Sequence, residues 1–187
     1  MNTTSIRYRP AEISDTFGIV KVLVDTWRST YSHIISKETL QKRTYEYIEP
    51  RWRERIKNLT KEDVMYVAEN DKQGIVGIIW GRTEMLNPID KIVDLEKFNG
   101  ELCAIYVLKN YQRRKIGVNL VSRVVNYLLK HNIHSMLVWV LKENPYKKFY
   151  EKLGARFIVD KFLEIENEKY LESAYVWEKI EDIFPLK

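Results

Sequence analysis

The residues best placed to do chemistry lie between Glu101 and Gly117, in the stretch ELCAIYVLKNYQRRKIG. Its pattern predicts a strand, a short loop and the first turn of a helix. The first N–H groups of a helix have no intrahelical partners and carry the positive end of the helix dipole. Arg113, Arg114 and Lys115 add three cations at the same point. The stretch therefore predicts an anion-binding site, most simply for a phosphate.

The composition fits a single soluble domain over residues 1–187. Hydrophobic residues make up 45% and charged residues 30%, both ordinary for globular proteins, and this length can bury a continuous core. The net charge of +5 agrees with simple solubility and also with an anionic ligand. A nucleic-acid-binding protein would carry a longer basic stripe or a recognised module. We therefore expect no nucleic-acid partner.

Cysteine use and hydropathy predict a cytoplasmic protein. The one cysteine, Cys103, excludes a disulfide framework within the chain. No run approaches the ~18 apolar residues of a membrane span, and the first ten residues lack the apolar core of a signal peptide. We expect no membrane partner. Because Cys103 stands in an apolar run, we expect it to be a small buried residue.

Hydrophobic periodicity predicts the elements that position these residues. Strands are expected over residues 5–9, 64–70, 75–84, 100–107, 135–141, 156–166 and 169–179. Helices are expected over 16–33, from Ser36 to an interruption at Pro50, onward from residue 51, over 115–131, and from Asn144 or Pro145 to Gly154. A surface loop is expected over Asn87–Asn99. The order predicts a mixed α/β (α+β) fold whose central, mostly antiparallel sheet has helices on both faces.

Two motifs follow one another on the expected elements. Tyr106 and Val107 end the central strand, and Gln112-Arg113-Arg114-Lys115-Ile116-Gly117 follows. Asn144 comes after the next strand, followed by Phe149-Tyr150-Glu151-Lys152-Leu153-Gly154. Together they resemble the GCN5-related N-acetyltransferase (GNAT) superfamily over almost the whole chain. The resemblance implies the acyl-CoA N-acyltransferase fold. Softer similarities to one bacterial branch of the superfamily are WRSTY at 27–31 and ESAYVW at 172–177.

The resemblance implies acetyl-CoA as co-substrate, with no metal. Its pyrophosphate would bind the N–H groups of residues 113 to 118, where Gly117 allows a close approach. Its pantetheine amides would pair with the edge of the central strand, and Asn144 would bond the same arm. Gln112 could bond either the loop or the ligand. The implied donor-binding residues are Ile105, Tyr106, Val107, Gln112, Arg113, Arg114, Lys115, Ile116, Gly117, Val118, Asn144 and Tyr150.

Lys115 departs from the family pattern, which has glycine at this position. If the position needs a positive φ, lysine bears a conformational cost that glycine does not. The side chain could be an exposed lysine at a helix start, or its ammonium could contact a phosphate directly. Both interpretations stay open.

The resemblance also implies roles in acetyl transfer. Tyr150 would donate a proton to the CoA thiolate; the alternative is a tyrosine that fills the core beside Phe149. Glu101 is the candidate base, acting through water or with a raised pKa; the alternative is an edge-of-sheet glutamate paired with a lysine. Trp27 and Tyr31 are candidate walls of the acceptor pocket, although such aromatics more often pack in the core. The N–H near Val107 would stabilise the oxyanion.

The predicted function is acetyl-CoA-dependent N-acetylation of a primary amine on a small molecule or peptide. Transfer is expected to be direct, in a ternary complex, because a buried Cys103 would be a poor acetyl carrier. One alternative is a non-catalytic acyl-CoA-binding sensor, and another is a nucleic-acid-binding protein that uses the basic loop. The final hairpin offers an edge for a homodimer.

Overall fold

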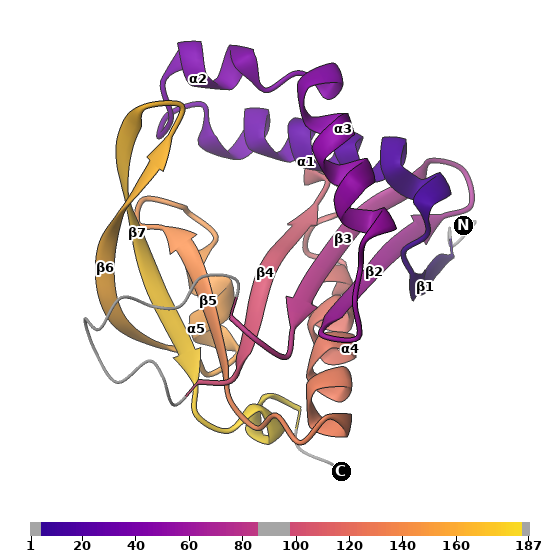
Figure 1. Cartoon of the computed structure of the whole chain (residues 1–187), viewed down its shortest axis with the longest axis vertical. Coiled ribbons are helices and arrows are strands. Elements are labelled where there is room, and N and C mark those ends of the chain that lie inside the picture. Colours follow the sequence, from indigo (N-terminus) through magenta and orange to yellow (C-terminus); the bar gives the residue numbers. More distant parts are fainter. Residues whose placement is uncertain (1–4, 86–97, 185–187) are drawn as a thin grey trace. The chain divides into compact units, whose positions relative to one another are not determined.

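The computed structural model describes residues 5–85 and 98–184 of the chain. They form two compact units (Figure 1). The first comprises Met1–Trp80 with Ala104–Val124, and the second comprises Gly81–Cys103 with Val125–Lys187. Strand β4 (Gly100–Val107) and helix α4 (Ile116–Lys130) each contribute residues to both units. The loop expected over Asn87–Asn99 lies, up to residue 97, outside the described residues.

In the first unit the strand order is β1-β2-β3-β4. Strand β1 (Ile6–Pro10) pairs antiparallel with β2 (Asp63–Asn70), which leads through a tight turn into β3 (Gly74–Arg82). At this turn Asn70 Oδ1 accepts the N–H groups of Lys72 and Gln73, each at 3.1 Å, and Gly74 has a φ of +70°. These are the turn residues that the sequence predicts.

Three helices separate β1 from β2, and they break where the sequence did not predict a break. They are α1 (Thr16–Tyr31), α2 (Lys37–Lys42) and α3 (Tyr45–Lys57). The expected interruption at Pro50 is wrong, because Pro50 lies inside α3. Thr44 starts that helix by accepting the Tyr47 N–H on its hydroxyl at 3.2 Å. So close to the helix start, Pro50 costs one backbone hydrogen bond without ending the helix.

Helices cover both faces of β3, as expected. On one face the rings of Trp52 from α3 and Trp80 from β3 meet edge to face, with centroids 6.2 Å apart. On the other face a β-carbon at Gly77 would lie 3.4 Å from Ile116 Cγ2, at the start of α4. Trp80 and Gly77 stand three positions apart, and side chains an odd number apart on a strand point to opposite faces. Within this unit the fold therefore positions the start of α4 directly against the sheet.

In the second unit the strand order is β4-β5-β7-β6. The start of β4 pairs parallel with β5 (Met136–Leu141), whereas β7 (Glu168–Trp177) pairs antiparallel with both β5 and β6 (Arg156–Ile165). The short helix α5 (Lys147–Lys152) connects β5 to β6 and is followed by Gly154 at a φ of +87°. A mostly antiparallel sheet with a parallel pair at β4–β5 agrees with the mixed sheet predicted from the sequence.

No helix in residues 5–85 or 98–184 is long and apolar enough to cross a membrane.

Candidate functional site

The loop between β4 and α4 contains two non-glycine residues in the left-handed region. Arg113 has a φ of +59° and Lys115 a φ of +62°, so the position at which the family has glycine does need a positive φ here. Left-handed residues within a turn direct successive N–H groups into a concavity that suits an anion. The Lys115 carbonyl accepts both the backbone N–H and the side-chain amide of Asn119, each at 3.0 Å. The first turn of α4 therefore holds Lys115 in this conformation.

Strand β4 anchors the beginning of the same loop. Gln112 Nε2 donates to the Val107 carbonyl at 3.1 Å, and the Leu108 N–H donates to the Val76 carbonyl of β3 at 3.0 Å. Of the two roles that the sequence allows for Gln112, the structure thus shows the bond to the loop. The side chains of Arg113, Arg114 and Lys115 are exposed. The first unit therefore presents three cations beside the backbone donors at the start of α4.

The candidate acceptor residues Trp27 and Tyr31 lie together near the end of α1. Their rings meet edge to face with centroids 4.9 Å apart, and Tyr31 is buried. Trp27 Nε1 also donates to Tyr106 Oη of β4 at 3.1 Å. Burial raises the pKa of Tyr106, partly offset by the Trp27 hydrogen bond and the charge of Arg43. The cluster therefore links residues predicted for the acceptor to a residue predicted for the donor.

Arg43 belongs to this cluster, and the sequence did not predict it. Its guanidinium carbon lies 3.7 Å from the centroid of the Trp27 ring, in cation–π geometry. Arg43 follows α2, sixteen residues after Trp27. No sequence period connects these two positions, so only the turn after α1 brings them together.

In the second unit, Tyr150 lies on α5 among aromatic rings. It is 8% exposed, and its ring centroid lies 5.5 Å from Phe149, 6.4 Å from Tyr175 and 6.2 Å from Trp177. Tyr175 Oη donates to Glu151 at 3.1 Å. The ring is thus held in one orientation by packing, which would fix the direction of its hydroxyl.

Asn144 shapes the turn from β5 into α5. Its Oδ1 accepts the Tyr146 N–H at 2.8 Å, its N–H donates to the Leu141 carbonyl at 2.8 Å, and its carbonyl accepts the Lys147 N–H at 3.2 Å. Asn144 is buried. The residue that the resemblance assigns to the pantetheine arm therefore also organises the backbone that leads to Tyr150.

Glu101 lies on an interior strand of the sheet, opposite Leu137 of β5, and is 8% exposed. The interpretation of Glu101 as an edge-of-sheet glutamate is therefore wrong. Cys103 is half-buried, so the prediction that it is buried is wrong too. The reason lies in the pairing: the β4–β5 register joins Gly100 to Met136 and Glu101 to Leu137, and burial of β4 decreases after Leu102.

A second buried carboxylate, Glu172, lies on the same face of the sheet as Glu101. Cross-strand partners share a face, and the registers place Glu172 opposite Leu141, two alternations along β5 from the partner of Glu101. Glu172 lies 3.5 Å from Lys161 Nζ, which in turn lies 4.0 Å from the Trp139 ring centroid. Burial raises the pKa of Glu172, opposed by Lys161. Its place beside the apolar run 173–177 was the available sequence signal.

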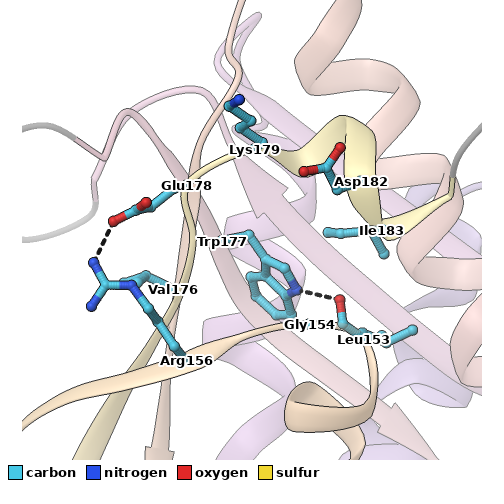
Figure 2. Close-up of a pocket in the computed structure, with 9 residues that line it drawn as sticks. All are labelled: Leu153, Gly154, Arg156, Val176, Trp177, Glu178, Lys179, Asp182 and Ile183. Atoms are coloured by element: carbon cyan, nitrogen blue, oxygen red, sulfur yellow. Dashed lines mark hydrogen bonds and ion pairs between the residues drawn. The ribbon is translucent and has the colours of Figure 1, made fainter.

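A pocket of about 240 Å³ opens beside Trp177 in the second unit (Figure 2). Trp177 Nε1 donates to the Leu153 carbonyl at 2.8 Å, and Arg156 pairs with Glu178 at the rim. The pocket is lined by Leu153, Gly154, Arg156, Val176, Trp177, Glu178, Lys179, Asp182 and Ile183. Because this lining includes none of the residues predicted for donor, acceptor or catalysis, we do not assign the pocket to the reaction.

Comparison with known proteins gives a consistent result. Residues 23–155 match the Acetyltransferase (GNAT) family. The uncharacterized N-acetyltransferase YuaI of Bacillus subtilis (strain 168) is 31% identical over 173 residues, which cover 92% of each chain. The PaiA N-acetyltransferase of Thermoplasma acidophilum, solved in complex with coenzyme A, superposes with a TM-score of 0.61 at 21% identity over 90% of this chain and 98% of its own.

YncA of Salmonella typhimurium, solved with acetyl-CoA, superposes with a TM-score of 0.61 at 12% identity and covers 94% of each chain. At such identities PaiA and YncA show the shared fold. The family match and the YuaI relative each span most of the sequence. This protein therefore belongs to the acetyltransferase (GNAT) family.

Proposed function

We propose that this protein is a cytoplasmic, single-domain N-acetyltransferase that moves the acetyl group of acetyl-CoA directly to a primary amine of a small molecule or peptide. The observation that carries the proposal is the loop before α4. There, two left-handed residues, the first N–H groups of the helix and three exposed cations occur together. This combination suits a pyrophosphate and needs no metal ion.

The donor would bind along β4 as well as at the loop. Pairing between β4 and β5 is seen at Gly100 and Glu101, and burial decreases from Cys103 onward. We propose that the pantetheine amides pair with the backbone of Ile105, Tyr106 and Val107 as an added strand would. The solved complexes of PaiA with coenzyme A and of YncA with acetyl-CoA support this donor.

The reaction requires a neutral amine, because an ammonium has no lone pair. In the proposed mechanism Glu101 removes the amine proton through a water molecule, and the amine nitrogen attacks the thioester carbonyl. The N–H near Val107 stabilises the oxyanion that forms. The C–S bond then breaks, and Tyr150 first hydrogen-bonds and then protonates the CoA thiolate. The products are the acetylated amine and free CoA.

Direct transfer is preferred over an acetyl-cysteine intermediate, although Cys103 is only half-buried. Its sulfur lies 4.0 Å from the Glu101 carbonyl oxygen. A carbonyl accepts a hydrogen bond from a thiol and does not stabilise a thiolate, which is the nucleophilic form. Cys103→Ala is therefore expected to keep turnover.

The function is tested by measuring acetyl-CoA binding calorimetrically and CoA release with a thiol reagent across a panel of primary amines. Turnover with at least one amine, retained by Cys103→Ala, supports direct acetyl transfer. Tight acetyl-CoA binding without acetylation of any amine would instead favour the non-catalytic sensor. If the chain bound oligonucleotides with a steep salt dependence and acetyl-CoA displaced them, the nucleic-acid alternative would be favoured.

Lys115→Gly separates the conformational cost of the lysine from its charge. Because Lys115 has a positive φ without any ligand, the strain is present in the free protein and largely cancels from binding. Glycine should raise the free energy of unfolding by up to about 1 kcal/mol. If the ammonium contacts a phosphate, acetyl-CoA affinity should fall about threefold to tenfold at low salt, and less at high salt.

Lys115→Asn is the matched control, because asparagine tolerates the left-handed region and removes the same charge. Chemical denaturation and calorimetric titration at two salt concentrations give the two readouts. Equal or tighter acetyl-CoA binding by both variants would show that Lys115 is only an exposed residue at the helix start.

A further inference from the structure

We propose that the amine acceptor carries an anionic group, and that the Arg43 guanidinium binds this group. The inference rests on the proposed function and deepens it, because it names the class of acceptor. Its basis is the cluster of Trp27, Tyr31, Arg43 and Tyr106, all of which lie in the first unit.

The cluster holds the guanidinium in a defined place. Arg43 Cζ lies 3.7 Å above the Trp27 ring. That ring is fixed by its hydrogen bond to Tyr106 Oη and by the edge-to-face contact with Tyr31. An arginine stacked on an aromatic ring still presents N–H donors along the rim of its guanidinium plane, and these match the two oxygens of a carboxylate or a phosphate.

The same contact disfavours a cationic acceptor at this aromatic wall. An ammonium group binds the π face of a tryptophan, but Arg43 already covers one face of Trp27. A second cation there would be repelled by the guanidinium at short range. The aromatic residues that on sequence grounds suit any amine therefore favour, in the structure, an amine with a negative charge elsewhere in the molecule.

Neighbouring charges on α1 do not reverse this preference. Asp25 already accepts hydrogen bonds from Lys21 Nζ at 2.5 Å and Tyr45 Oη at 2.6 Å. Arg28 adds another cation, 5.3 Å from the Tyr45 ring centroid. The end of α1 thus carries Arg28 and Arg43, whereas its carboxylate is engaged by a lysine and a phenol.

Arg43 is also linked to the proposed reaction centre. Tyr106, which accepts the Trp27 hydrogen bond, directly precedes Val107, whose N–H is the proposed oxyanion donor. An acceptor that presents its amine near Val107 can extend its other end along Tyr106 and Trp27 toward Arg43. The anionic group may not be identified by this argument alone, since carboxylate and phosphate oxygens share the required chemistry.

The test compares matched amines that differ only in charge: amino acids with their C-terminal amides, and aminoalkyl phosphates with the corresponding amino alcohols. A linear polyamine represents cationic acceptors. The wild-type protein should prefer the anionic member of its best pair by about tenfold to a hundredfold in kcat/KM. The better of the carboxylate and phosphate series identifies the group.

Arg43→Gln should remove that preference by raising KM for the anionic member about tenfold or more, with kcat/KM for the neutral member unchanged. Arg43→Lys should restore part of the preference. Lys42→Gln is the charge-matched control: it removes an adjacent cation that is half exposed and paired with Glu38 at 3.0 Å, and it should keep the preference.

Calorimetric titration of the anionic and neutral members supplies a readout that does not need turnover. Tighter binding of the anionic member by wild type than by Arg43→Gln supports the inference even if no amine is acetylated, in which case the proposed function alone fails. Equal use and binding of both members by wild type, preference for the polyamine, or equal losses for both members in Arg43→Gln would each overturn it.

Discussion

Replacing Tyr150 with phenylalanine is expected to lower kcat about a hundredfold, the usual scale for loss of a general acid. The hydroxyl is the only group removed, and the phenyl ring keeps its packing against Phe149, Tyr175 and Trp177. Acetyl-CoA affinity should therefore change little. The loss arises because the CoA thiolate would leave without a hydrogen bond or a proton from the protein.

Tyr175→Phe is the matched control for this prediction. It removes a second phenol from the same aromatic cluster, one that donates to Glu151 and has no proposed part in the chemistry. The comparison needs kcat from CoA release, acetyl-CoA affinity from calorimetry and thermal unfolding of all three proteins. Full turnover by Tyr150→Phe would assign Tyr150 to core packing, the alternative role that the sequence left open.

Glu101→Gln is expected to lower kcat/KM by about a hundredfold at neutral pH, because glutamine cannot accept the amine proton. Glutamine has nearly the same shape, so packing opposite Leu137 should survive. The deficit should shrink at high pH, where more of the acceptor is already neutral, and with amines of low pKa. A pH profile of kcat/KM for wild type and variant, with two acceptors of different pKa, measures both effects.

Glu172→Gln tests whether the other buried carboxylate on this face acts as the base. We expect a small effect on kcat/KM, because Glu172 forms a cross-strand pair with Lys161. A large loss with Glu172→Gln and full turnover with Glu101→Gln would move the role of base to Glu172. If both variants, and Tyr150→Phe as well, kept wild-type turnover, none of these assignments would stand.

Local signals in the sequence were sufficient for most of the elements. Strand β4 has the predicted bounds, and the hairpin turn into β7 lies where Asn167 was expected to place it, with φ values of +50° at Glu166 and +67° at Asn167. Side-chain periodicity and turn chemistry act over a few residues, so a single sequence can report them. The break between α2 and α3 was missed because the Thr44 cap, rather than Pro50, determines it.

By itself the sequence determined the order of elements, the anion-binding loop and the resemblance to acetyltransferases, because each depends on residues close together in the chain. The tertiary structure decided the left-handed conformation of Lys115, the half-burial of Cys103, the interior position of Glu101 and the placement of Arg43 over Trp27. These features depend on which strands pair and on how turns direct distant segments. Such contacts join residues with no common period, so no local pattern encodes them.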